Sequence, residues 1–73
     1  MGNNMTTAEH LKKLRRTLCP SQYELAVELQ ITASSLSLYE SGKRTPGYIT
    51  IRKILSLAKK NNISLTIDDI KPE

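Results

Sequence analysis

The apolar residues of this chain recur at the spacing of a helix surface in four successive segments. Each segment places an apolar residue every three or four positions and polar residues between them, as in an amphipathic helix that buries one face. The four apolar faces consist of Leu11, Leu14 and Leu18; Leu25, Ala26 and Leu29; Leu36 and Tyr39; and Tyr48, Ile51, Ile54, Leu55 and Ala58. The pattern therefore predicts four short helices.

Local signals predict where these helices begin. Thr6 with Glu9, and Ser21 with Glu24, have the spacing of a capping box, in which an N-cap hydroxyl and a carboxylate three residues later satisfy free backbone N–H groups. Thr32 is placed to cap a third helix over residues 33–41. The fourth helix is predicted over residues 47–60.

Other residues predict where the helices end. Pro20 disfavours helical geometry at Cys19 and ends the first helix. Gly42 suits the left-handed position that often follows a helix. Asn61 and Asn62 end the fourth helix.

The last segment allows two interpretations. Residues 63–67 alternate between apolar and polar as in a strand, whereas residues 66–69 have the residue types that cap a final helical turn. Only four residues follow, so a long fifth helix is excluded. We expect an all-α bundle of four to five helices with an irregular or short helical tail. This tail either pairs two subunits or closes the core.

Composition and charge restrict the class of protein. The chain has 73 residues, which is one domain, and 11 Lys and Arg against 7 Asp and Glu give a net charge of +4. No apolar run approaches the roughly 20 residues of a membrane span, and no signal-peptide pattern is present. We therefore expect a cytoplasmic protein that does not contact membranes. Because His10 and the single Cys19 have no potential ligands or catalytic partners near them in sequence, we expect no metal, no cofactor and no enzymatic activity.

The second and third predicted helices are joined by only three residues, 30–32, which is the connection of a helix-turn-helix. Ala26 is small where the two helices must approach closely, and Ile31 fills the corner between them. Leu36 and Tyr39 anchor the second of the two helices and leave its other face free.

This segment resembles the helix-turn-helix of the Cro/repressor-like, or lambda-repressor-like, DNA-binding domains. The matching residues are Ser21, Gln22, Glu24, Leu25, Ala26, Leu29, Leu36, Tyr39, Glu40, Gly42, Lys43, Arg44 and Pro46. The resemblance implies one such domain over residues 6–73, with the motif at about 22–41, after a disordered lead-in at 1–5. It also implies a left-handed conformation at Gln30, where the family usually carries Gly, and an ion pair between Glu40 and an arginine of the first helix, for which Arg15 is the candidate.

The resemblance also implies how the chain would contact DNA. The start of the third helix would enter the major groove, with Ala33, Ser34, Ser37 and Leu38 facing the base edges. Phosphate contacts would come from Ser21, Gln22, Ser41, Lys43 and Arg44. The basic residues of the first and fourth helices are more simply interpreted as solvent-exposed charges.

Three functions agree with these residues. The first is a sequence-specific transcriptional regulator of repressor type that binds double-stranded DNA as a homodimer. The second is the antitoxin of a toxin–antitoxin pair, which would also bind a toxin protein and would expose an apolar patch at its C-terminal segment. The third is a helix-turn-helix that serves as a protein-interaction module, which the small, uncharged side chains of the third helix allow.

Overall fold

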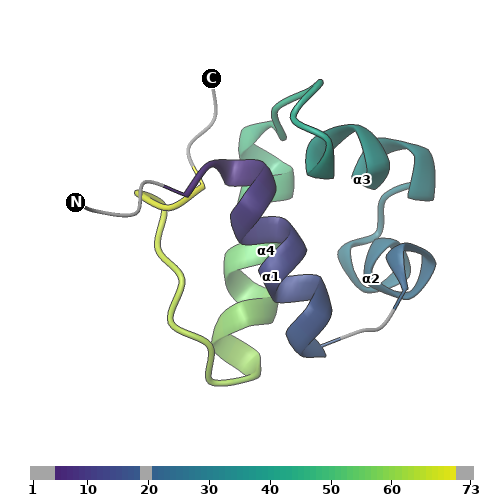
Figure 1. Cartoon of the computed structure of the whole chain (residues 1–73). Helices are drawn as coiled ribbons and strands as arrows, with labels where there is room; N and C mark the ends of the chain where they lie inside the picture. Colours follow the sequence, from purple (N-terminus) through teal and green to yellow (C-terminus); the bar gives the residue numbers. More distant parts are fainter. Residues whose placement is uncertain (1–4, 19–20, 71–73) are drawn as a thin grey trace.

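The computed structural model describes residues 5–18 and 21–70, and in these residues it contains four α-helices and no strand. The helices are α1 (Thr7–Leu18), α2 (Gln22–Leu29), α3 (Ala33–Glu40) and α4 (Tyr48–Lys60). Figure 1 shows α2 and α3 on one side of α1, and the C-terminal tail, residues 61–70, on the other. The all-α prediction is confirmed. The predictions for residues 1–4 and for Cys19 and Pro20 lie outside the described residues.

The predicted caps form at three of the four helix starts. The Thr6 N–H donates to Glu9 Oε1 at 2.8 Å, and the Glu9 N–H donates to Thr6 Oγ1 at 3.2 Å, so the first capping box is reciprocal. Ser21 Oγ accepts from the Glu24 N–H at 3.1 Å, but the Glu24 carboxylate accepts no bond from the Ser21 N–H in the described residues, so only half of the second predicted capping box forms. Thr32 Oγ1 accepts from the Ser35 N–H at 3.0 Å. Each bond satisfies an N–H group that the first turn of a helix cannot pair internally.

Two left-handed residues end α2 and follow α3. Gln30 has φ 59° and ψ 42°, as the resemblance implies, and its N–H donates to the carbonyl oxygens of Ala26 and Val27. Gly42 has φ 78°, and a Cβ there would meet no atom within 4 Å. The constraint at Gly42 is therefore the backbone conformation and not a lack of space.

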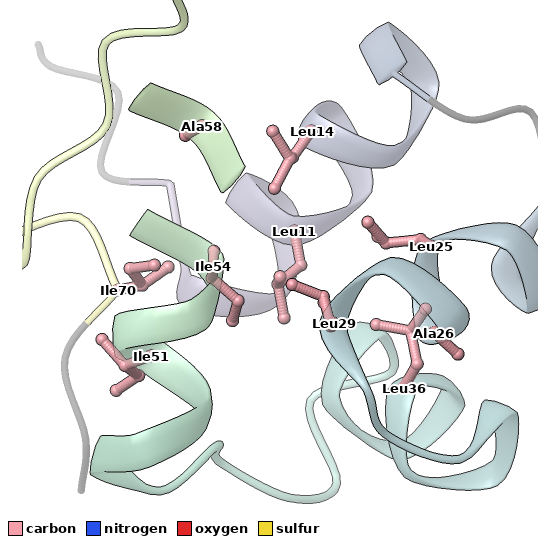
Figure 2. Close-up of a cluster of buried hydrophobic side chains, with 10 residues drawn as sticks. All are labelled: Leu11, Leu14, Leu25, Ala26, Leu29, Leu36, Ile51, Ile54, Ala58 and Ile70. Carbon is pink, nitrogen blue, oxygen red and sulfur yellow. The ribbon is translucent and has the colours of Figure 1, made fainter. Parts of the chain in front are cut away.

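The core is aliphatic and draws on every helix and on the tail. Figure 2 shows these side chains converging from all four helices, with Leu11 in the middle. The buried apolar residues are Leu11, Leu14, Leu25, Ala26, Leu29, Leu36, Ile51, Ile54, Ala58 and Ile70. Leu18, Tyr39, Leu55 and Leu57 pack against them and are partly buried.

Two expectations for α4 are wrong. Tyr48, predicted to be inward, is 60% exposed. A helical side chain points back over the preceding turn of its own helix. Tyr48 is the first residue of α4, so no earlier turn lies beneath its side chain to connect it with the core. Leu57 lies outside the apolar face predicted for this helix, but it packs against the core.

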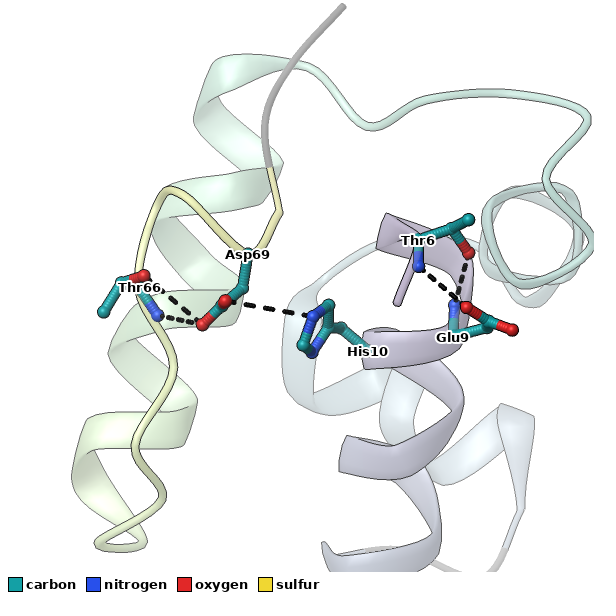
Figure 3. Close-up of polar contacts among 5 residues, drawn as sticks. All are labelled: Thr6, Glu9, His10, Thr66 and Asp69. Atoms are coloured by element: carbon teal, nitrogen blue, oxygen red, sulfur yellow. Dashed lines mark hydrogen bonds and ion pairs between the residues drawn. The ribbon is translucent and has the colours of Figure 1, made fainter. Parts of the chain in front are cut away.

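The tail folds back to close the core. Ile70 is fully buried, and Ile63 and Leu65 pack against the core cluster, whereas Ile67 is 41% exposed. A turn at 66–69 forms in place of a strand: the Thr66 N–H donates to Asp69 Oδ2 at 3.0 Å, and the Asp69 N–H donates to the Thr66 carbonyl at 2.9 Å. Figure 3 shows Asp69 facing His10 of α1, with 3.9 Å between Oδ1 and Nε2.

Candidate nucleic-acid interface

The turn between α2 and α3 sets the orientation of α3. Ala26 and Leu36 are buried where the two helices meet, and Ile31 packs against the core beside them. The Ile31 N–H donates to the Ala26 carbonyl at 3.0 Å, which ties the corner to the end of α2. These contacts hold the inner face of α3 and leave its opposite face in water.

The four residues predicted to face base edges differ in their exposure. Ser34, Ser37 and Leu38 are exposed on the outer face of α3. Ala33 is half-buried and packs against the core cluster. Three of the four predicted side chains thus share one accessible face, and Ala33 lies at its edge.

Ser21 and Gln22 lie at the start of α2, where backbone N–H groups and the positive end of the helix dipole favour an anion. Because Ser21 Oγ accepts its hydrogen bond from Glu24, its own O–H remains able to donate. The Gln22 side chain donates from Nε2 to Glu40 Oε1 at 3.2 Å. A phosphate contact from the Gln22 side chain would use the remaining hydrogen of its amide group.

The loop after α3 is tied to that helix through the Leu38 carbonyl. This oxygen accepts from the Lys43 N–H at 3.1 Å, the Arg44 N–H at 3.3 Å and the Ser41 hydroxyl at 3.0 Å. The side chains of Lys43 and Arg44 are exposed. Ser41 would need to rotate its hydroxyl away from Leu38 to donate to a phosphate.

One buried carboxylate connects the three helices of this surface. Glu40 is 4% exposed, and Arg15 Nε of α1 donates to its two oxygens at 2.9 and 3.0 Å. The predicted partner of Glu40 is thus confirmed. The Gln22 bond to the same carboxylate was not predicted, because Gln22 and Glu40 are 18 residues apart and no local pattern joins them.

A further cation lies beside this surface. An open groove between the start of α1 and the loop after α3 is lined by Lys12, Glu9, Ser41 and Arg44, among others. Lys12 was interpreted from the sequence as a solvent-exposed charge. The structure brings it to the same groove as Arg44, and only the packing of α1 against α3 reveals this.

Two other kinds of site are absent from the part of the chain that the structure describes. It holds no group of three or more His, Cys, Asp or Glu side chains placed to bind a metal ion. None of the described helices is both long enough and apolar enough to cross a membrane.

Comparison with known proteins agrees with the geometry. No curated protein and no solved structure matches the chain. A family model described as helix-turn-helix matches residues 21–66, which is well over half of the chain and includes α2, α3 and α4. The chain therefore belongs to the Cro/C1-type helix-turn-helix family, which is a family of DNA-binding domains.

Proposed function

We propose that this chain is a sequence-specific transcriptional regulator of repressor type that places α3 in the major groove of double-stranded DNA. The observation that carries the proposal is the position of α3. Its inner face is anchored by Leu36 and by the ion pair of Glu40 with Arg15. Its outer face is exposed between the start of α2 and the cationic loop at 43–44.

The outer face of α3 recognises bases through small side chains. Ser34 and Ser37 can donate to or accept from several base edges, and Leu38 can contact a thymine methyl group. Ala33, at the edge of this face, offers only its methyl group. None of these residues forms the bidentate contacts with guanine or adenine that discriminate most strongly, so DNA shape supplies part of the specificity.

Phosphate contacts position α3. Ser21, Gln22 and the start of α2 hold one phosphate, and Ser41, Lys43 and Arg44 bind the backbone near the other end of α3. These groups carry the salt-dependent part of the affinity. They do not distinguish one sequence from another.

The regulator acts in the cytoplasm as a symmetric homodimer. A single α3 covers few base pairs, whereas two copies related by a two-fold axis recognise two half-sites of an inverted repeat.

A salt titration tests DNA binding. Fluorescence anisotropy with a labelled mixed-sequence duplex should show affinity that falls with salt, with a slope of about −0.9 per neutralised phosphate. Lys43→Ala and Arg44→Ala should each weaken binding to all duplexes and reduce the slope by about 1. Lys59→Ala, which removes an exposed cation of α4 far from α3 in sequence, is the matched control.

Selection from random duplexes tests base recognition. Ser34→Ala and Ala33→Gln should change the selected sequence, whereas Arg44→Ala should leave it unchanged. The opposite result would contradict the assigned roles. No binding by the wild-type chain at low salt would contradict the regulator and favour the interaction module.

The antitoxin hypothesis has less support. It calls for an exposed apolar patch on the C-terminal segment, and in the described tail only Ile67 is a large apolar side chain in contact with much water. The hypothesis of an interaction module is supported by the absence of charged side chains on the outer face of α3.

A further inference from the structure

The outer face of α2 is acidic and partly apolar. Tyr23, Glu24, Val27 and Glu28 are all exposed there, opposite the buried Leu25, Ala26 and Leu29. The two glutamates are four residues apart on the helix, as are Tyr23 and Val27, so the four side chains form one surface. Val27 is 57% exposed although its side chain has no polar atom. We call these four residues the acidic face.

The outer face of α4, beside it, is basic and partly apolar. Arg52 and Lys60 are exposed, Lys53 is half-buried and Ile49 is 72% exposed. These four residues form what we call the basic face. They line an open groove with Glu28, so the basic and acidic faces meet along the contact between α2 and α4.

The two acids of the acidic face have no partner within the described residues. Glu24 and Glu28 make neither an ion pair nor a side-chain hydrogen bond there. Of the other described acids, Glu9 belongs to a capping box, Glu40 is paired with Arg15, and Asp69 accepts from Thr66, whereas Asp68 of the tail is exposed and unpaired. Two of the three unpaired acids of the described residues therefore lie on one helix, next to unpaired cations on its neighbour.

This chemistry does not suit DNA. Glu24 and Glu28 of the acidic face would repel phosphate, and Val27 and Ile49 would gain nothing from contact with a phosphate backbone. The surface suits a protein with an acidic apolar helix and a basic apolar helix lying side by side. The chain itself presents that arrangement.

We infer that the occupant of this surface is a second copy of the chain, with the acidic face of each copy on the basic face of the other. A two-fold axis makes such an interface self-complementary, because both copies offer the same two faces. The tail closes its own core through Ile70 and so leaves pairing to α2 and α4. The inference rests on the dimer of the proposed function, but not on DNA binding.

Charge exchange tests this inference. Sedimentation equilibrium of the wild-type chain should give twice the 8.2 kDa monomer mass, with association that weakens as salt screens the exposed charges. A chain with Glu24→Lys and Glu28→Lys should be monomeric, and so should a chain with Arg52→Glu and Lys53→Glu. An equimolar mixture of these two chains should recover the doubled mass, because every acidic face then meets a basic one.

Control variants separate pairing from folding. The substituted side chains are exposed or half-buried, and circular dichroism should show wild-type helix content for each variant. Lys59→Glu changes a cation of α4 that lies beside the tail, outside the groove, and should leave the mass unchanged. Val27→Ser should weaken association at least tenfold without changing charge.

Three results would overturn the inference: a wild-type chain that stays monomeric over the whole concentration series, charge-reversed chains that keep the doubled mass, or a mixture that stays monomeric. None of these masses depends on DNA. A failure of DNA binding would therefore leave this test intact, and a monomeric variant can still be assayed for binding to one half-site.

Discussion

The helix-turn-helix segment, residues 21–41, and the tail, residues 61–70, both pack on the same core, but they are held there by different means. The segment is held by two caps, a left-handed corner and a buried carboxylate that contacts α1 and α2. The tail is held by one fully buried side chain, two partly buried ones, the turns at 61–62 and 66–69, and the contact of Asp69 with His10. A surface that must present side chains to a ligand is thus fixed at many points. A segment that only covers the core can depend on a few contacts.

The largest expected effect comes from breaking the ion pair of the segment. Arg15→Met leaves the Glu40 carboxylate buried at the edge of the core, with only the Gln22 side chain as a hydrogen-bond donor. We expect a loss of about 3 kcal/mol in the free energy of unfolding, at the lower end for buried pairs because the Arg15 side chain still contacts water. Urea denaturation measures this change in the free energy of unfolding.

Two further variants sharpen this first prediction. Arg16→Met, at an exposed neighbour on α1, should change stability by less than about 0.5 kcal/mol. The double variant Arg15→Met with Glu40→Leu should recover much of the loss, because no charge is then left buried. Equal effects at Arg15 and Arg16 would show that the pair does not stabilise the fold.

The next largest effect tests the tail. Ile70→Ala should cost about 2 kcal/mol, the lower end for a buried Ile→Ala change, because a segment near the chain end can shift into the space. Ile67→Ala is the matched control and should cost less than about 0.5 kcal/mol. Ile67→Asp should also remain folded, since that side chain is in contact with water. Thermal unfolding followed by circular dichroism compares all three variants, and equal losses at residues 67 and 70 would contradict core closure by Ile70.

A stabilising change is expected at the corner of the segment. Gln30 adopts φ 59°, which costs a residue with a Cβ about 1 kcal/mol, so Gln30→Gly should raise the free energy of unfolding by up to about 1 kcal/mol. Gln30→Ala should give no such gain, because Ala meets the same steric conflict. A Gly variant that is no more stable than the Ala variant would show that the corner is not strained.

The smallest effect concerns the pH dependence of the tail. The hydrogen bond from the Thr66 N–H lowers the pKa of Asp69 below 3.8. Desolvation opposes this shift in part, and the nearby His10 and the Thr66 hydroxyl add to it. A carboxyl group with a lowered pKa in the folded state stabilises the fold above its unfolded pKa, and the contribution disappears as pH falls through the folded value. NMR titration of the Asp69 carboxyl should give a pKa below 3.8.

Changes at Thr66 and Asp69 refine this last prediction. Thr66→Val removes the hydroxyl but keeps the backbone donor, so most of the lowered pKa should remain. Asp69→Asn should abolish the contribution that this group makes to stability above its unfolded pKa. An unshifted pKa in the wild-type chain would contradict the turn at 66–69.

Features that depend on neighbouring residues can be predicted from the sequence alone. Thr6, Ser21 and Thr32 cap helices because the group that each bonds lies three residues away. The apolar spacing determined which face of each helix is buried. The family resemblance added the left-handed Gln30 and the pairing of Arg15 with Glu40, which are 25 residues apart.

Features that depend on which helices and loops pack together follow only from the tertiary structure. Tyr48 and Leu57 lie on the same helix, and whether each is covered depends on where the core ends and not on their own spacing. Residues 63–67 alternate as a strand does, but no partner strand faces them in the described residues, so Ile70 closes a helical core instead. Lys12 approaches the groove of Arg44 only because α1 packs on α3. Local free energies select helices and turns, but burial is a property of the assembled fold, and it decides which exposed residues remain available to DNA or to a second chain.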